Sequence, residues 1–181
     1  METIETVTFG DSVTFVCNEM FAWCSNLKTV NFSDSIRTIC NGSFTRCVSL
    51  ESIEIPCYVQ KIGNSAFSSC PHLTTVCSKC VTPPEINSNT FDDNTKKNGT
   101  LLVPEGSEAD YRQHPYWKEF YHIYEGEITE DLKELTSNGS FERNEEEWIY
   151  DLQGRKVANN DDLKNTPAGI YIINGKKIVI K

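Results

Sequence analysis

The sequence predicts a β-rich repeat solenoid, in which short coils of chain stack on one another, followed by a small β-module. The main observation is a set of apolar positions that recur every 23 residues, with similar residues at Ile4, Leu27, Leu50 and Leu73 and at Val7, Val30, Ile53 and Val76. Phenylalanine recurs at the same interval, at Phe21, Phe44 and Phe67. One such repeat cannot bury its own apolar face, so each must stack on a neighbour.

Each coil is predicted to contain two short strands and a tight turn. In the third coil, residues 50–55 alternate between apolar and polar side chains and stop at Pro56, which cannot donate to a strand ladder. A second strand is expected at 59–62, and Gly63 then turns the chain. The following segment, NSAFSSC, places its phenylalanine and cysteine three residues apart, which favours a short helical turn.

This repeat resembles the BspA-like (Treponema pallidum-type) leucine-rich repeats of bacterial surface proteins, LxxIxIPxxVxxIGxxAFxxCxxL. The resemblance implies an α/β leucine-rich repeat solenoid, a right-handed superhelix that is β-rich and built from 23-residue repeats. The earlier coils depart from the pattern. Cys17 and Cys40 stand where the glycine is expected, and Gly10 and Ser33 stand where the proline is expected. The first coil begins within three residues of Met1, which suggests the tail of a longer array.

The block TPPEINSNTF…LLVPEGSEADYRQHPYWKEFYHIYEG resembles the terminal coil that closes such arrays. Within it, DDNTKKNG is expected to form a polar turn or loop, and Ser107 is expected to cap a helix through Asp110 that runs to about His114. The block is rich in aromatic residues, Tyr111, Tyr116, Trp117, Phe120, Tyr121 and Tyr124. We expect these side chains to cover the open end of the core; a sugar-stacking platform is the alternative.

The C-terminal segment contains two hairpin patterns, WIYDLQGRKV and GIYIINGKKIVIK, in which Asn174 and Gly175 suit a type I′ turn. These patterns predict a small antiparallel β-module, similar in part to the type IX sorting domains of Bacteroidetes surface and secreted proteins. The expected division is therefore repeats over 1–82, a capping repeat over 83–125, an acidic linker over 126–147 and the β-module over 148–181.

Five of the eight cysteines occupy repeat positions, where we expect an inward-facing ladder of free thiols, Cys17, Cys40, Cys24, Cys47 and Cys70. Stacked cysteines lie close enough for a disulfide, but burial does not require one. The remaining three are Cys57, Cys77 and Cys80. Cys77 and Cys80 form a CxxC motif, and a zinc site built on these three cysteines would need a fourth ligand such as His72. The sequence contains no second CxxC motif to complete such a site. We therefore predict no metal, and a Cys57 to Cys80 disulfide stays open.

The composition and the motifs of the sequence argue against several classes of function. The net charge of −9 argues against nucleic acid as a partner, and no apolar run approaches the length of a membrane span. The start, METIETVTF, lacks the features of a secretory signal. No nucleophile, P-loop or metalloprotease motif occurs, so we expect neither catalysis nor a cofactor. The family resemblance implies an extracellular or outer-surface location and a host or bacterial surface protein as partner, with a glycan as the alternative.

The predicted recognition surface is the concave sheet, where residues between the core positions point to solvent. The 23-residue interval aligns one row of Thr6, Thr29, Ser52 and Thr75 and a second of Thr8, Asn31, Glu54 and Cys77. We take Thr29, Asn31, Ser52, Glu54 and Thr75 as candidate ligand-binding residues. Two other hypotheses remain: small residues simply suit a solvated sheet face, or the solenoid is a structural stalk with no ligand.

Overall fold

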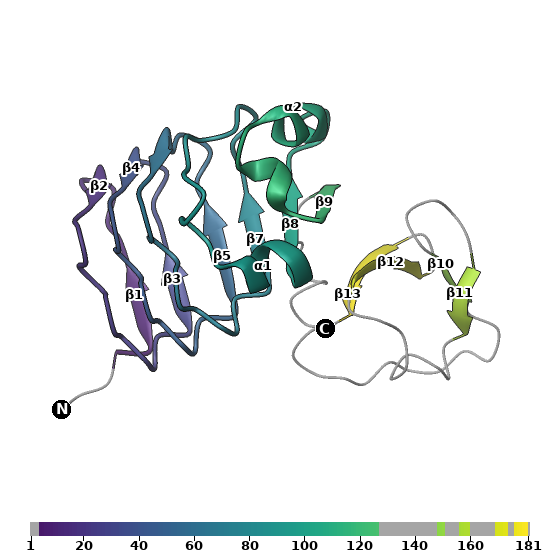
Figure 1. The fold of residues 1–181 in the computed structure, drawn as a ribbon, viewed down its shortest axis with the longest axis horizontal. Helices are drawn as coiled ribbons and strands as arrows, with labels where there is room; N and C mark the ends of the chain where they lie inside the picture. Colours follow the sequence, from purple (N-terminus) through teal and green to yellow (C-terminus); the bar gives the residue numbers. More distant parts are fainter. Residues whose placement is uncertain (1–3, 127–147, 151–155, 160–168, 174–175, 181) are drawn as a thin grey trace. The chain divides into compact units, whose positions relative to one another are not determined.

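The computed structural model describes residues 4–126, 148–150, 156–159, 169–173 and 176–180 (Figure 1). The elements of the first unit are, in chain order, β1 (Thr6–Thr8), β2 (Phe15–Val16), β3 (Thr29–Asn31), β4 (Thr38–Ile39), β5 (Ser52–Ile55), β6 (Lys61–Ile62), β7 (Thr75–Ser78), α1 (Asp93–Asn98), β8 (Thr100–Val103), α2 (Glu108–Gln113), η1 (Trp117–Glu119) and β9 (His122–Glu125). Each of the first three coils contributes one longer and one shorter strand.

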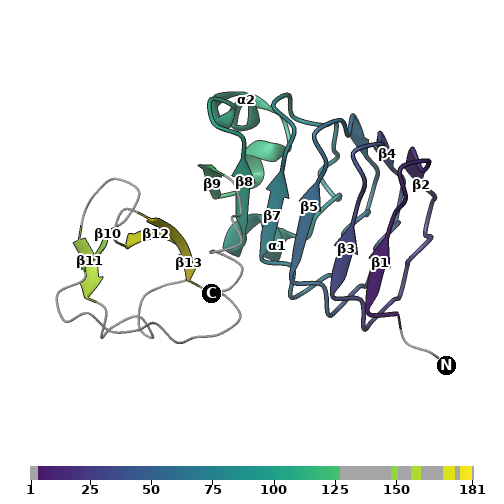
Figure 2. The same ribbon diagram turned by 180° about the vertical axis from the view of Figure 1, so that it is seen from behind.

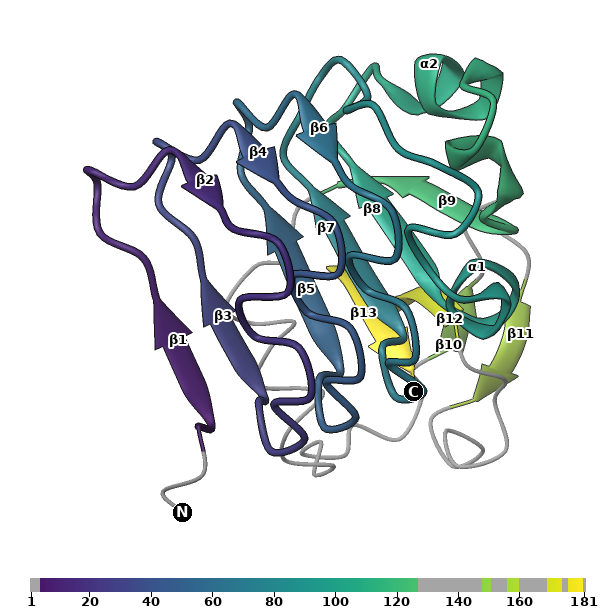
Figure 3. The ribbon, with the colours of Figure 1, turned by 60° about the vertical axis from the view of Figure 1, so that its left-hand side comes forward.

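The strands pair in parallel, each with the equivalent strand of the next coil. Val7 pairs with Val30, and Ile53 pairs with Val76, so the register joins residues 23 positions apart. The longer strands continue through β8 and β9, in the order β5-β7-β8-β9. The shorter strands form a separate sheet, β2-β4-β6 (Figure 3). The predicted leucine-rich repeat fold with parallel strands is thereby confirmed.

The segment after each short strand folds as a series of hydrogen-bonded turns. The prediction of a short helical turn at NSAFSSC is therefore wrong. Ser65 and Ser69 have positive φ angles of 54° and 58°, and such left-handed residues interrupt a right-handed helix. The same two positions are left-handed in the coils before, at Gly42 and Arg46 and at Glu19 and Trp23. Backbone hydrogen bonds to the next coil hold these turns, such as that from the Phe44 amide to the Ala66 carbonyl at 2.9 Å.

A ladder of phenylalanine rings runs through the core behind these turns. Phe21, Phe44, Phe67 and Phe91 stack in sequence, with ring centroids 5.4, 5.4 and 5.3 Å apart and interplanar angles of 10° or less. Phe44 and Phe67 are fully buried. The recurrence of phenylalanine every 23 residues predicted the first three rungs, and the structure adds Phe91 as the fourth.

Asparagines form a second ladder that the sequence analysis missed. The Asn41 amide donates to the side-chain oxygen of Asn18 at 3.0 Å, and the Asn64 amide donates to that of Asn41 at 2.8 Å. Each asparagine thus satisfies a backbone donor of the following coil, which the strands do not reach. Asparagine at 18, 41, 64 and 87 was a visible signal for this ladder.

All eight cysteines are free, but they do not share one environment. Cys47 and Cys70 are buried as expected, and their thiols donate to the carbonyls of Phe21 and Phe44. Burial raises the pKa of Cys47 to about 12 and the pKa of Cys70 to about 11. These two thiols are therefore protonated and poorly nucleophilic.

The other three ladder cysteines depart from the expected burial. Cys17 is exposed, and Cys24 and Cys40 are partly exposed. Cys17 and Cys24 belong to the first coil, which within the described residues stacks on the second coil alone, and Cys40 follows the short strand at the turn. Cys57 is exposed, whereas Cys80 is buried with its thiol 2.9 Å from the Pro56 carbonyl, so the two are not bridged.

The capping region contains two short helices, one of them unexpected. The DDNTKKNG segment forms α1 rather than a loop. Helix α2 begins after Ser107 as expected, but the Ser107 hydroxyl donates to the Pro104 carbonyl at 2.6 Å and does not cap the helix. The Glu125 carboxylate accepts from the Glu108 amide instead, at 3.0 Å, and so provides the cap from a distant strand.

The chain divides into two compact units, 1–127 and 128–181. In the second unit β10 (Trp148–Tyr150), β11 (Lys156–Asn159), β12 (Gly169–Ile173) and β13 (Lys176–Ile180) pair antiparallel in the order β11-β10-β12-β13. The two predicted turns, 151–154 and 174–175, and nearly all of the acidic linker lie outside the described residues. Among the described residues, no helix has the length and apolar character needed to cross a bilayer.

We expect Phe67→Ala to lower the free energy of unfolding by about 3–5 kcal/mol, because it removes a buried ring from the middle of the ladder. Phe15→Ala is the matched control: Phe15 is 55% exposed, and its loss should cost about 0.5 kcal/mol or less. Urea denaturation followed by circular dichroism measures both. Equal midpoints for the two variants would contradict a stabilising ladder.

Thiol titration of the native protein should label Cys17 and Cys57 first, because both are exposed. Cys47 and Cys70 should react only after denaturation, because burial raises the pKa of both thiols and blocks access to them. Mass spectrometry of labelled peptides resolves the sites. Rapid labelling of Cys47 in the native protein would be incompatible with its burial.

Candidate functional site

The candidate recognition surface is the solvent-facing side of β1, β3, β5 and β7, which we call the strand face (Figure 2). Thr6, Thr29 and Ser52 are exposed on it, in three successive coils. Thr75 is only 7% exposed and differs from the expectation that it would be accessible. The register places Thr75 between Ser52 and Thr100.

The second row of the strand face also becomes less exposed to solvent from the first coil to the fourth. Thr8 and Asn31 are exposed and bonded to each other, the Asn31 amide nitrogen donating to the Thr8 hydroxyl at 3.2 Å. Glu54 is half-buried and pairs with Lys79 at 2.7 Å. Cys77, the next residue of the row, is buried. The accessible strip therefore lies on β1, β3 and β5 and ends at β7.

A hollow of about 420 Å³ lies beside this strip, lined by Lys28, Ser49, Glu51, Ser52 and His72. Ser52 belongs to both the strip and the hollow. The two predicted rows of sheet residues did not indicate this hollow, because Ser49 and His72 lie in the turns that precede the strands. The hollow extends the polar surface around Ser52 beyond the two predicted rows.

The cap, residues 83–125, closes the phenylalanine ladder with aromatic side chains. Phe91 contacts Trp117 and Phe120 at centroid distances of 5.5 and 5.4 Å, and Tyr111 contacts Trp117 at 5.4 Å. Trp117 is fully buried, and its indole nitrogen donates to the Pro84 carbonyl at 2.8 Å. The Tyr111 hydroxyl donates to the Cys80 carbonyl at 2.8 Å. These contacts seal the end of the core.

Half of the aromatic residues proposed for the alternative sugar-stacking platform are buried in this core. Tyr111, Trp117 and Phe120 are buried and present no ring face to solvent. Tyr116 and Tyr121 are exposed, and Tyr124 is partly exposed. The cap aromatics therefore serve mainly to bury apolar surface.

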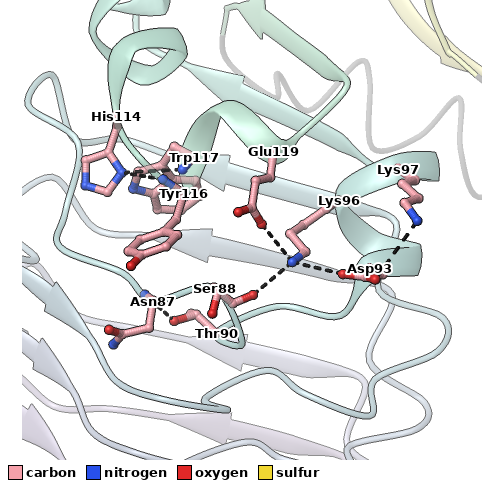
Figure 4. Close-up of polar contacts among 10 residues, drawn as sticks. All are labelled: Asn87, Ser88, Thr90, Asp93, Lys96, Lys97, His114, Tyr116, Trp117 and Glu119. Carbon is pink, nitrogen blue, oxygen red and sulfur yellow. Dashed lines mark hydrogen bonds and ion pairs between the residues drawn. The ribbon is translucent and has the colours of Figure 1, made fainter.

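A buried ammonium group joins three parts of the cap (Figure 4). Lys96, whose side chain is 10% exposed, lies 2.9 Å from Glu119 and 3.0 Å from Asp93, and it donates to the Ser88 carbonyl at 2.8 Å. The two carboxylates raise the pKa of Lys96 against the opposing effect of burial. Lys96 thus fixes α1 to η1 and to the loop before Phe91.

His114 has a structural role in the cap. His114 ends α2, and its Nδ1 accepts from the Tyr116 and Trp117 amides at 3.3 and 3.4 Å (Figure 4). Burial lowers the pKa of His114, which favours this neutral acceptor form. Within the described part of the chain, no three His, Cys, Asp or Glu residues are grouped so that they could hold a metal ion.

Comparison with known families identifies the repeats. A family model described as "BspA type Leucine rich repeat region (6 copies)" matches residues 1–105. The chain belongs to this family. The stacked parallel strands and the 23-residue register are the form that these BspA-type repeats take in this chain. A comparison with curated proteins found no match.

Two solved structures are similar to this BspA-type chain. A leucine-rich repeat protein from Bacteroides ovatus is 26% identical over 68% of this chain, with a TM-score of 0.50. A leucine rich cell surface protein from Faecalibacterium prausnitzii is 26% identical over 56% of it, with a TM-score of 0.44. The matched regions cover 30% and 36% of those two chains. Both are longer proteins, of which this chain corresponds to about a third.

We expect Trp117→Ala to destabilise the first unit by about 3–5 kcal/mol, since the indole is fully buried against Phe91, Tyr111 and Phe120. Trp23→Ala is the control. Trp23 is 66% exposed, with the Arg46 guanidinium 4.0 Å from its ring, and its loss should cost about 1 kcal/mol or less. Thermal unfolding compares the two. A melting temperature unchanged by Trp117→Ala would show that the cap does not seal the core.

Proposed function

We propose that this chain is a non-enzymatic recognition module of a cell-surface or secreted protein, and that it binds a protein partner through the strand face. The observation that carries the proposal is the strip of short polar side chains on β1, β3 and β5. Family membership supports it, because stacked leucine-rich repeats present extended surfaces that suit recognition. The division into repeats, cap, linker and β-module belongs to the same proposal.

The chemistry of the strip suits a protein backbone. The exposed hydroxyl and amide groups, Thr6, Thr8, Thr29, Asn31 and Ser52, offer both donors and acceptors on a surface without bulky side chains. The single charge in the strip, Glu54, is already neutralised by Lys79. A partner can therefore approach closely and does not need a strongly charged surface of its own.

The size of the strip sets the extent of the interface. A standard interface uses about 20–30 residues on each side, and the six residues of the strip are far fewer. The partner must therefore also cover neighbouring surface. The hollow beside Ser52 is contiguous with the strip and supplies part of that surface. Ser52 belongs to both the strip and the hollow, so it lies where the two parts of such a footprint meet.

The alternatives are weaker on the same observations. A glycan platform on the cap would rest on Tyr116 and Tyr121, since three of the other aromatics are buried. A stalk without a ligand would leave the polar strip without a role beyond solvation. A secretion role for 148–181 is proposed from the sequence resemblance alone, because the structure describes only its strands.

Ser52→Arg should abolish capture of a surface-protein partner, because a long charged side chain would fill the hollow and stand above the strip. Stability should change by about 0.5 kcal/mol or less, since Ser52 is exposed. Immobilised protein is incubated with solubilised bacterial and host surface proteins, and the captured proteins are quantified by mass spectrometry.

Thr14→Arg is the matched control for this experiment, because Thr14 is also exposed but precedes β2, in the other sheet. It should retain every partner of the parent protein. Loss of the same partner from both variants, or from neither, would place the binding site away from the strand face. Failure of the parent to enrich any protein would favour the stalk.

A further inference from the structure

An open groove of about 540 Å³ lies where the chain turns after β5 and again after β7. Its walls come from these two equivalent corners, which stack on each other because β5 and β7 are paired. The lining residues are Cys57, Tyr58, Val59, Gln60, Lys79, Val81, Thr82, Pro83 and Pro84. The volume falls within the range of about 300–1,000 Å³ that is typical of small-ligand sites.

Tyr58 provides an aromatic surface in this groove. Its side chain is 59% exposed, although the Arg37 guanidinium lies 4.9 Å from the ring centroid. Arg37 is itself held by the backbone, donating to the carbonyls of Asp34 and Ile36 at 2.6 and 3.2 Å. The contact with Arg37 orients the ring, and most of the ring remains available to a ligand.

The opposite wall is apolar and preformed. Val81 is 64% exposed at the position equivalent to Tyr58 one coil later, and Pro83 is half-buried beside it. Pro84 is buried, and its carbonyl accepts the indole hydrogen bond of Trp117 at 2.8 Å. The two consecutive prolines fix the backbone here. A ligand would therefore enter a groove whose shape is already set.

The electrostatic character of the groove favours an uncharged ligand. Lys79 is the one charged side chain among its lining residues, and it is paired with Glu54 at 2.7 Å. Besides the Cys57 thiol and the Tyr58 hydroxyl, the groove presents the exposed amide of Gln60 and the exposed hydroxyl of Thr82, each able to donate and to accept. A carboxylate or phosphate would have to compete with Glu54 for the ammonium group.

We propose that this groove binds a neutral carbohydrate, with a sugar ring stacked on Tyr58 and its hydroxyls bonded to Gln60 and Thr82. A pyranose has an apolar face for an aromatic ring and a rim of hydroxyls that both donate and accept. That combination matches the groove better than an apolar peptide, which would leave the amide and hydroxyl unpaired. The groove and the strip share no residue, although Lys79 of the groove pairs with Glu54 of the strip, and this inference does not depend on the proposed protein partner.

Binding is tested on the full chain with neutral trisaccharides of glucose, mannose, galactose and N-acetylglucosamine, by saturation-transfer NMR and calorimetry. We expect at least one of them to bind. Tyr58→Ala should weaken that binding about tenfold, the scale of one good ring contact, and Tyr58→Phe should preserve it. Tyr121→Ala is the matched control, because Tyr121 is 67% exposed on the cap and should not matter.

Several results would overturn the assignment. Absence of binding by the parent at millimolar sugar would do so, as would loss of binding in Tyr121→Ala with retention in Tyr58→Ala. Tighter binding of a uronic acid trisaccharide than of its neutral counterpart would show that the groove selects charge. Ser52→Arg should bind the sugar as the parent does, which separates this result from the test of the strand face.

Discussion

The structure depends on one constraint: each side chain of the core packs on the same position of the next coil. The phenylalanine ladder shows it most clearly, because Phe44 and Phe67 lie nearly parallel with centroids 5.4 Å apart. The strand register, the asparagine ladder and the paired turns follow the same interval. Since a coil buries its apolar face only against a neighbour, an end of the stack needs a different solution. The cap supplies it with Trp117 and Phe120.

The interior of the repeats was predictable because it is periodic. The interval of 23 residues identifies which residues stack, and alternation within each strand identifies which side faces the core. The cap and the accessibility of surface residues were less predictable, because the contacts that decide them do not repeat every 23 residues. Helix α1 has little apolar character and is held by the buried contacts of Lys96. Likewise, the pattern placed Thr75 on the strand face, but only the structure shows that it is buried.

The two proposed binding surfaces arise from different parts of the same coil. The strand face uses positions that alternate with the core and carry similar small residues in successive coils. The groove uses the corner after the long strand, where the equivalent residues differ: Ser12, Ser35, Tyr58 and Val81. A corner position contributes nothing to the core ladders, so its side chain is free to vary from coil to coil. The repeats therefore present similar side chains along the sheet, whereas the side chains at the corner differ from one coil to the next.

The asparagine ladder has a consequence for how such an array can change in length. The side-chain oxygens of Asn18 and Asn41 accept from the backbone of the coil that follows, at the amides of Asn41 and Asn64. Insertion or loss of one whole repeat leaves each internal coil with a neighbour of the same pattern, so these bonds can form again. Within the repeats, a change of another length would misalign the rings, the asparagines and the strands; the cap departs from the interval, since Phe91 stacks on Phe67 and Thr100 pairs with Thr75. The natural unit of evolutionary change is therefore the repeat, and its duplication or deletion would move the corner groove along the array without altering the interior.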